Sequence, residues 1–128
     1  MKLSKKAYYG LRATLALAAS PRALSLQELA AQEAIPAPYL EKILQVLRKD
    51  GIVTATRGAT GGYRLTNADT SAWQVIAALD GPLKIFAPVK GTLPCLQITH
   101  CQANVIFRDI ETALEDTLKK TLLAPKNT

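Results

Sequence analysis

Arg57-Gly58-Ala59-Thr60-Gly61-Gly62-Tyr63-Arg64-Leu65 is the stretch that decides the fold of this 128-residue chain. Its three glycines lie between two short runs of β-prone residues, 52–56 and 63–65. Glycine reaches the positive-φ conformations and permits the close backbone approach that a hairpin tip needs. The stretch therefore predicts an antiparallel hairpin with an arginine on each side of its tip. Such a hairpin is typical of a DNA-binding wing, but it also fits an ordinary surface turn, so the flanking sequence has to decide.

Two helices are predicted before the hairpin. Ser4 precedes apolar residues spaced near 3.6 residues apart, which predicts a helix that ends before Pro21. Ser25-Leu26-Gln27-Glu28 is a capping box, in which the serine hydroxyl and the glutamate carboxylate each bond a first-turn amide. It opens a short helix that ends near Ala34.

A third helix follows the turn Ile35-Pro36-Ala37-Pro38 and stops at Gly51, where a left-handed C-cap is expected. Its apolar residues share one face, and polar residues occupy the other. Three helices, the last two joined by a tight turn, followed by a two-stranded hairpin are the order of a winged helix-turn-helix. The fold class is therefore predicted to be mainly α with a small β-hairpin wing.

The second half of the chain predicts two more helices. Asp69-Thr70-Ser71 caps a fourth helix that ends at Asp80-Gly81-Pro82, and a last, long helix covers residues 102–123. One stripe of the last helix is apolar, and its members are Val105, Ile106, Phe107, Ile110, Ala113, Leu114, Leu118 and Leu122. A long one-sided helix usually needs a partner, so a symmetric homodimer is expected, with the folding of this helix onto its own domain as the alternative.

The domain organisation that follows has four parts. Residues 1–82 form a winged helix-turn-helix DNA-binding domain, 83–101 a loop with both cysteines, 102–124 a dimerisation helix and 125–128 a tail. The dimer interface is expected at Ile106, Phe107, Ile110, Leu114 and Leu118.

Charge is distributed unevenly along the chain. Residues 1–65 hold ten Lys/Arg and four Asp/Glu, whereas residues 66–128 hold six of each, so the whole net charge of +6 lies in the first half. Basic charge confined to one folded region indicates a polyanionic partner such as DNA, although a solvated basic surface has the same composition.

Several function classes are excluded by composition. No run approaches the roughly 20 apolar residues of a membrane span, and no cleavable apolar core follows the basic N-terminus, so a cytoplasmic protein without membrane contact is expected. The chain has a single histidine, and its glycine-rich hairpin lacks the strand–loop–helix context and Lys-Ser/Thr ending of a phosphate loop. An enzyme is therefore not expected.

Several motifs together resemble one family of small bacterial winged-helix transcriptional regulators, typified by IscR, NsrR and CymR. The matching stretches are Leu3-Ser4 with Tyr9-Gly10-Leu11-Arg12, Ile35-Pro36 with Tyr39-Leu40-Glu41, residues 47–53, the hairpin, and Phe107-Arg108-Asp109-Ile110. The resemblance covers nearly the whole chain. It implies a homodimeric regulator that binds double-stranded DNA at a near-palindromic operator, often in genes of iron–sulfur, sulfur or redox metabolism. Repression and activation are both compatible with it.

The resemblance also implies a set of DNA-binding residues. Tyr39, Glu41 and Gln45 would lie in the major groove, where Glu and Gln can pair with base edges. Arg57 would enter the minor groove from a wing shaped by Gly58, Gly61 and Gly62. The phosphate contacts would come from Lys5, Lys42, Arg48, Lys49 and Arg64. One departure is Ala59-Thr60, where relatives often have a proline and a further glycine.

Cys95 and Cys101 are the only cysteines, and the sole histidine, His100, precedes the second. Cluster-binding relatives carry three cysteines here, and Val89 stands where the first should be. The acidic ligand that others supply from the first helix falls at Tyr8, and a histidine of some relatives is replaced by Asn104.

Three interpretations of this loop stay open. Cys95, Cys101 and His100 could hold an iron–sulfur cluster completed by another group, since thiolates and imidazole suit iron. The two thiols could instead act as a redox switch, or pack as small apolar residues in a loop without a sensing role. Control by a regulatory protein partner, without a cluster, is a further alternative.

Overall fold

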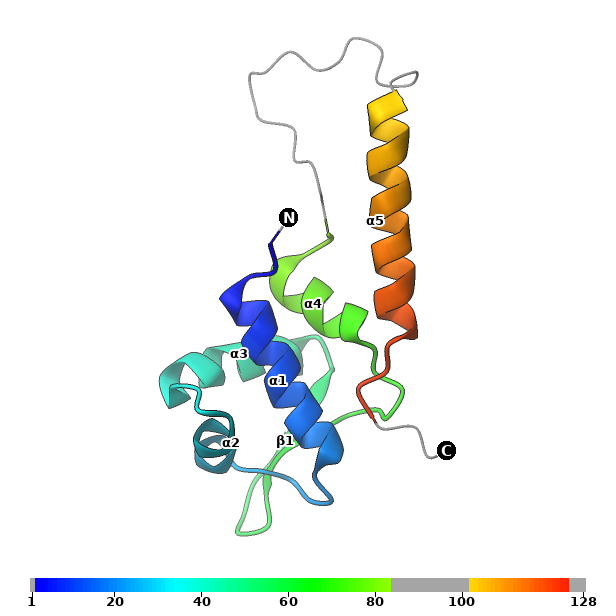
Figure 1. Cartoon of the computed structure of the whole chain (residues 1–128). Coiled ribbons are helices and arrows are strands. Elements are labelled where there is room, and N and C mark those ends of the chain that lie inside the picture. The colour runs from blue at the N-terminus through cyan, green and yellow to red at the C-terminus, as the bar shows by residue number, and fades with distance from the viewer. Residues whose placement is uncertain (1, 84–101, 125–128) are drawn as a thin grey trace.

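The computed structural model describes residues 2–83 and 102–124 (Figure 1). Within them the order is α1 (Lys5–Ala19), α2 (Leu26–Glu33), α3 (Ala37–Lys49), β1 (Val53–Thr56), β2 (Gly62–Leu65), α4 (Ala72–Asp80) and α5 (Gln102–Lys120). The first four helices and the hairpin pack together, and α5 projects from them as a long rod (Figure 1). This arrangement confirms the predicted fold class.

The core is centred on the apolar face of α3. Leu40, Ile43, Leu44 and Leu47 of this helix are almost completely buried, because apolar residues at these spacings share one side of the helix. The close contact between α1 and α4 depends on Gly10, where an added Cβ would lie 2.2 Å from Leu79 Cδ1. The core therefore fixes the position of α3 while its opposite face stays open to solvent.

Serine side chains start the first two helices as predicted. The Ser4 hydroxyl accepts a hydrogen bond from the Ala7 amide, and Ser25 and Glu28 form the expected capping box. Ser4 also donates to the carboxylate of Asp80, its backbone amide at 3.0 Å from Asp80 Oδ2. This pair joins the start of α1 to the end of α4.

The end of α5 differs from the prediction, because the helix stops at Lys120 rather than at residue 123. Beyond it the chain returns to the start of α4, where the Ala72 amide donates to the Thr121 carbonyl at 2.8 Å and the Leu123 amide donates to the Thr70 carbonyl at 3.0 Å. Leu123 is buried in the core, with 5% of its surface exposed. These long-range contacts replace the last helical turn, so Leu122 lies off the apolar stripe to which it was assigned.

Candidate nucleic-acid interface

The solvent face of α3 carries polar side chains. Glu41, Lys42, Gln45, Arg48 and Lys49 are exposed, and none of them forms an ion pair or a side-chain hydrogen bond with another described residue. The predicted base-reading and phosphate-binding residues of α3 therefore lie together on one surface. Their donors and acceptors are open to an external ligand.

Tyr39 differs from these neighbours because its ring is half-buried against the core. It packs edge-on against the ring of Tyr9 from α1, with ring centroids 5.6 Å apart and an interplanar angle of 82°. Only part of the Tyr39 side chain is therefore available to a ligand, and the rest belongs to the contact between α1 and α3.

The wing is an antiparallel hairpin in which Thr56 pairs with Gly62 and Val53 with Leu65. Its tip turns at Gly58, which has a φ of +106°, and is closed by a hydrogen bond from the Gly61 amide to the Gly58 carbonyl at 3.0 Å. Arg57 is exposed beside this turn. The predicted minor-groove arginine therefore lies at the base of an exposed loop.

Two wing glycines are required by close backbone contacts. A Cβ at Gly61 would lie 2.3 Å from the Thr56 carbonyl oxygen, and one at Gly62 would lie 2.5 Å from the Leu24 carbonyl oxygen. The second contact arises because β2 also pairs with the segment between α1 and α2. The Tyr63 amide donates to the Leu24 carbonyl at 2.7 Å, and the Leu24 amide donates to the Tyr63 carbonyl at 3.1 Å. The wing is thereby held to the helical domain.

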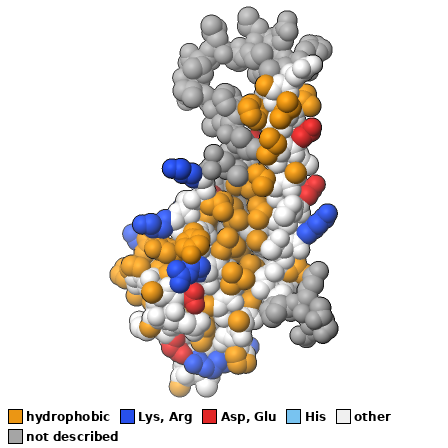
Figure 2. Space-filling model, in the orientation of Figure 1, with side chains coloured by type: hydrophobic (Ala, Val, Ile, Leu, Met, Phe, Trp, Pro, Cys, Tyr) orange, Lys and Arg blue, Asp and Glu red, His pale blue; other side chains and the backbone are white. Residues whose placement is uncertain are grey.

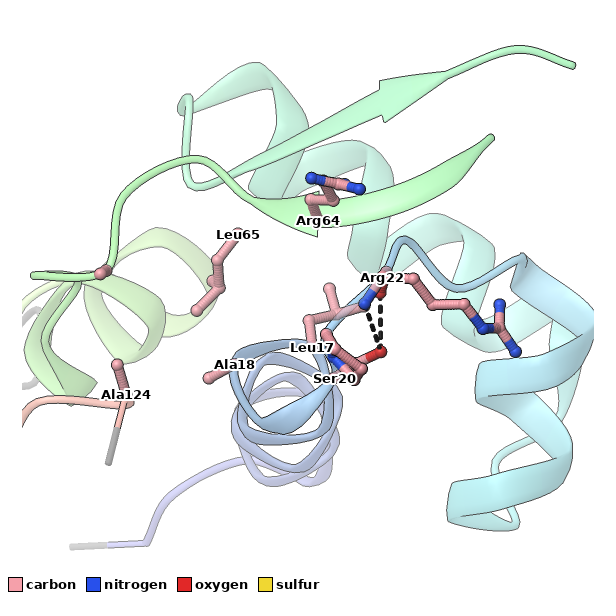
Figure 3. Close-up of a pocket in the computed structure, with 9 residues that line it drawn as sticks. Leu17, Ala18, Ser20, Arg22, Arg64, Leu65 and Ala124 are labelled. Atoms are coloured by element: carbon pink, nitrogen blue, oxygen red, sulfur yellow. Dashed lines mark hydrogen bonds between the residues drawn. The ribbon is translucent and has the colours of Figure 1, made fainter. Parts of the chain in front are cut away.

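A hollow of about 190 Å³ lies beside the base of the wing (Figure 3). Arg64 and Leu65 contribute from β2, and Leu17 and Ala18 from α1. Figure 3 shows the guanidinium of Arg22 directed away from this hollow, toward the neighbouring helix. Arg64 has no carboxylate partner among the described residues, so it remains available to a phosphate.

Internal ion pairs leave most of the basic charge unmatched. Arg12 pairs with Glu33 and Arg22 with Glu28, which neutralises two of the four acids in residues 1–65. The other basic residues of this region form no ion pair with a described residue; they are Lys2, Lys5, Lys6, Lys42, Arg48, Lys49, Arg57 and Arg64. Unmatched cations on α3 and the wing create a positive potential that attracts a polyanion.

Glu28 titrates abnormally within this region. The hydrogen bond from the Arg22 guanidinium and the backbone amide of Ser25 lower its pKa from 4.5 to about 2. Glu28 thus stays charged, and its carboxylate remains bonded to Arg22 and to the Ser25 amide of the capping box.

The outer part of α5 exposes apolar side chains that the domain does not cover. Val105, Ile106, Phe107 and Ile110 are exposed, and Figure 2 shows hydrophobic side chains along α5. Leu114 is half-buried, and Leu118 packs partly against the core of its own chain. Of the predicted dimer contacts, Ile106, Phe107 and Ile110 are therefore the most accessible.

The predicted sensing residues Cys95, His100 and Cys101 lie outside the described residues. Within residues 2–83 and 102–124, no group of three or more His, Cys, Asp or Glu side chains could hold a metal ion. In the same part of the chain, no helix has the length and apolar character of a membrane span.

Sequence reasoning assigned no role to Tyr9 and Arg12, which contact Tyr39 and Glu33. No spacing rule connects residue 9 to residue 39, because the contact depends on how α1 crosses α3. The only sequence signal was their place in the Tyr9-Gly10-Leu11-Arg12 motif.

The chain is similar in sequence to known proteins over most of its length. Residues 3–125 match the family described as Rrf2, iron-dependent transcriptional regulator. A protein of Synechocystis described as an HTH-type transcriptional regulator is 44% identical over 90 residues, which cover 67% of this chain and 61% of that protein. The HTH-type transcriptional regulator IscR of Vibrio vulnificus is 34% identical over 128 residues, covering 96% of this chain and 75% of its own length.

The fold also matches a solved structure. CymR, the global cysteine regulator of Bacillus subtilis, superposes with a TM-score of 0.77 and 29% identity, covering 96% of this chain and 93% of that one. The similarity therefore extends over the helical domain, the wing and the long helix together.

Proposed function

This chain belongs to the Rrf2 family of transcriptional regulators, and from that premise we propose that it is a homodimeric DNA-binding regulator that reads a near-palindromic operator. Members of the family are transcription regulators and not enzymes, in agreement with the sequence-based expectation. The observation that carries the proposal is the open face of α3, whose polar side chains have no partner within the described residues and lie in the same basic domain as the wing.

The proposed division of labour follows the chemistry of each side chain. Glu41 and Gln45 read base edges, with the exposed part of Tyr39 beside them, while Arg57 enters the minor groove. Lys5, Lys42, Arg48, Lys49 and Arg64 bind phosphates, which sets affinity and register rather than sequence preference. As DNA is the proposed ligand, the cytoplasm is the proposed location.

Selection of binding sites from a random duplex library tests the proposal. The protein is incubated with the library, bound duplexes are recovered and amplified, and the enriched sequences are read. We expect two related half-sites with inverted symmetry and centres about one or two helical turns apart, since a two-fold protein dimer imposes its symmetry on the site. Enrichment of no sequence, or of a single unrepeated half-site, would contradict the proposal.

Dimerisation is proposed to use the exposed apolar side chains of α5. Ile106 is 57% exposed and Val105 54% exposed, which is unfavourable for a helix that stays in water. Packing of α5 against its counterpart in a second copy would remove this surface from solvent. Leu3, which precedes α1, and Tyr8 and Leu15 on α1 are also exposed and could extend the contact.

The signal is proposed to be read by Cys95 and Cys101. The family is described as iron-dependent, and two thiols with an adjacent imidazole can bind iron or form a disulfide. Among the described residues, no group of three or more His, Cys, Asp or Glu side chains could hold a metal ion by itself. Anaerobic purification with iron and sulfide analysis, for the natural chain and Cys95→Ser, separates the chemistries. Iron and sulfide lost in the variant indicate a cluster. A metal-free protein whose DNA binding changes on oxidation indicates a thiol switch. If neither result is obtained, control by a protein partner or a loop without a sensing role remains.

A further inference from the structure

Arg12 on α1 holds the end of α2. Its guanidinium donates to the backbone carbonyl of Glu33 at 2.7 Å, and its Nε lies 3.4 Å from the carboxylate of the same residue. The next residue, Ala34, turns the chain toward α3 in the left-handed conformation with a φ of +54°, which is unusual without glycine. A contact from outside the turn therefore fixes the point from which α3 starts.

Tyr9 on the same helix holds the start of α3 through its edge-on contact with Tyr39. The N-cap of α3 is Pro36, which makes no side-chain capping hydrogen bond. The first turn of α3 thus lacks the local restraint that Ser4 and Ser25 give to α1 and α2. Its position depends on packing, which includes the buried side chain of Leu40 and the ring contact that Tyr9 of α1 makes with Tyr39.

Tyr8 connects these two contacts. Its ring centroid lies 5.9 Å from that of Tyr9 and 5.7 Å from Cζ of Arg12, a distance at which the guanidinium is attracted to the ring face. Tyr8, Tyr9 and Arg12 therefore form one cluster, named here the α1 brace. Both sides of the turn between α2 and α3 are attached to it, and α1 lies beside these two helices in Figure 1.

We propose that Tyr9 and Arg12 are positioning residues for sequence reading, acting through the α1 brace on the first turns of α3. The inference rests on the proposed DNA-binding function. Base reading needs hydrogen-bond distances and angles within narrow limits, so a small displacement of Tyr39 and Glu41 removes discrimination between sequences. Phosphate contacts come from long, flexible Lys and Arg side chains and tolerate the same displacement.

The test compares Tyr9→Leu, Tyr9→Phe and Arg12→Gln with the natural chain on two probes. The first is the duplex that the natural chain enriches from a random library, and the second is a scrambled duplex of equal length and composition. We expect Tyr9→Leu and Arg12→Gln to lose roughly tenfold or more of the preference for the selected duplex, the discrimination that one well-placed base contact supplies. Affinity for the scrambled duplex should stay within about twofold, and Tyr9→Phe should keep the preference, because its ring still packs on Tyr39.

Ile76→Val is the control for general loss of stability, because Ile76 is buried in α4 and is not one of the three residues of the brace. It should lower the melting temperature and leave the preference between duplexes unchanged. Retention of full preference by Tyr9→Leu and Arg12→Gln would overturn the inference, as would an equal loss on both probes. Failure of the natural chain to enrich any duplex would overturn the proposed function itself, and it is seen before a variant is made.

Discussion

At the scale of single residues, Arg57 carries the proposed minor-groove contact. It is exposed beside the turn at Gly58 and has no ion pair with a described residue, so its guanidinium is available to DNA. We predict that Arg57→Ala weakens binding to the selected duplex by about 1–3 kcal/mol. The melting temperature should not change, because the side chain is exposed and forms no ion pair with a described residue. Fluorescence anisotropy with a labelled duplex measures the effect, and unchanged affinity would remove the wing from the interface.

Gly62 is constrained by sterics rather than by a ligand. Its φ of +140° and the 2.5 Å approach of an added Cβ to the Leu24 carbonyl oxygen make Gly62→Ala unfavourable twice over. We predict a loss of roughly 3 kcal/mol in the free energy of unfolding. Gly58→Ala is the matched control, since its φ of +106° is also positive but its added Cβ meets open space. Thermal or urea unfolding should show the smaller loss for Gly58→Ala; equal losses would mean that the contact with Leu24 is not tight.

Glu28 gives the protein an acid-dependent contribution to stability. Its pKa falls from 4.5 to about 2 in the folded chain, chiefly because Arg22 donates to the carboxylate. A depressed folded-state pKa stabilises the protein above pH 4.5, and this stabilisation disappears as the pH falls toward 2. We predict that the difference in unfolding free energy between the natural chain and Glu28→Gln narrows between pH 5 and pH 2.5. A difference that stays constant over this range would mean that Glu28 is not paired in solution.

At the scale of elements, the starts of α1 and α2 could be predicted from the sequence, whereas the end of α5 could not. Ser4 and Ser25 cap their helices with bonds to residues three positions away, so local sequence contains the whole signal. The end of α5 depends on Leu123 entering the core and on hydrogen bonds to Thr70 and Ala72, which lie about fifty residues earlier. The spacing of apolar residues predicted a helix beyond Lys120, because this spacing contains no information on hydrogen bonds and packing with residues so distant in the sequence.

The same limit applies to the candidate site. The polar face of α3 and the wing arginine follow from spacing and turn chemistry, and the structure brings the α3 residues onto one surface as expected. The contact between Tyr9 and Tyr39 has no local signal, because it exists only once α1 crosses α3. The residues proposed to bind DNA were accessible to sequence reasoning, whereas the residues proposed to position them were not.

For α5, we predict that Ile106→Glu converts dimers to monomers. The charge would be placed among the exposed apolar side chains of the helix, where burial against a second copy carries a desolvation penalty. Thr112→Glu is the control, because Thr112 is exposed and helical spacing places it on a different side of α5 from Ile106, Phe107 and Ile110. Sedimentation velocity measures the assembly state. A natural chain that sediments as a monomer, or an Ile106→Glu variant that remains dimeric, would contradict the proposed interface.

At the scale of the whole molecule, the lysines and arginines of residues 1–65 that lack an ion pair with a described residue lie in the winged domain, and exposed apolar side chains lie in two places. Val105, Ile106, Phe107 and Ile110 are on the outer half of α5, whereas Leu3, Tyr8, Leu15 and Val46 are in the winged domain. A two-fold dimer built through α5 would carry two basic winged domains, each with its own α3 and wing. Such a particle suits a site with two half-sites, since each domain reads one of them.

The salt dependence of binding to the selected duplex is the most direct test of this account. The eight basic residues of each winged domain that lack an ion pair with a described residue provide enough cations for several phosphate contacts. If 6–10 phosphates are neutralised, affinity should fall by about 10³–10⁵-fold between 50 and 200 mM salt. An affinity that changes less than about tenfold over this range would contradict DNA binding through the basic face.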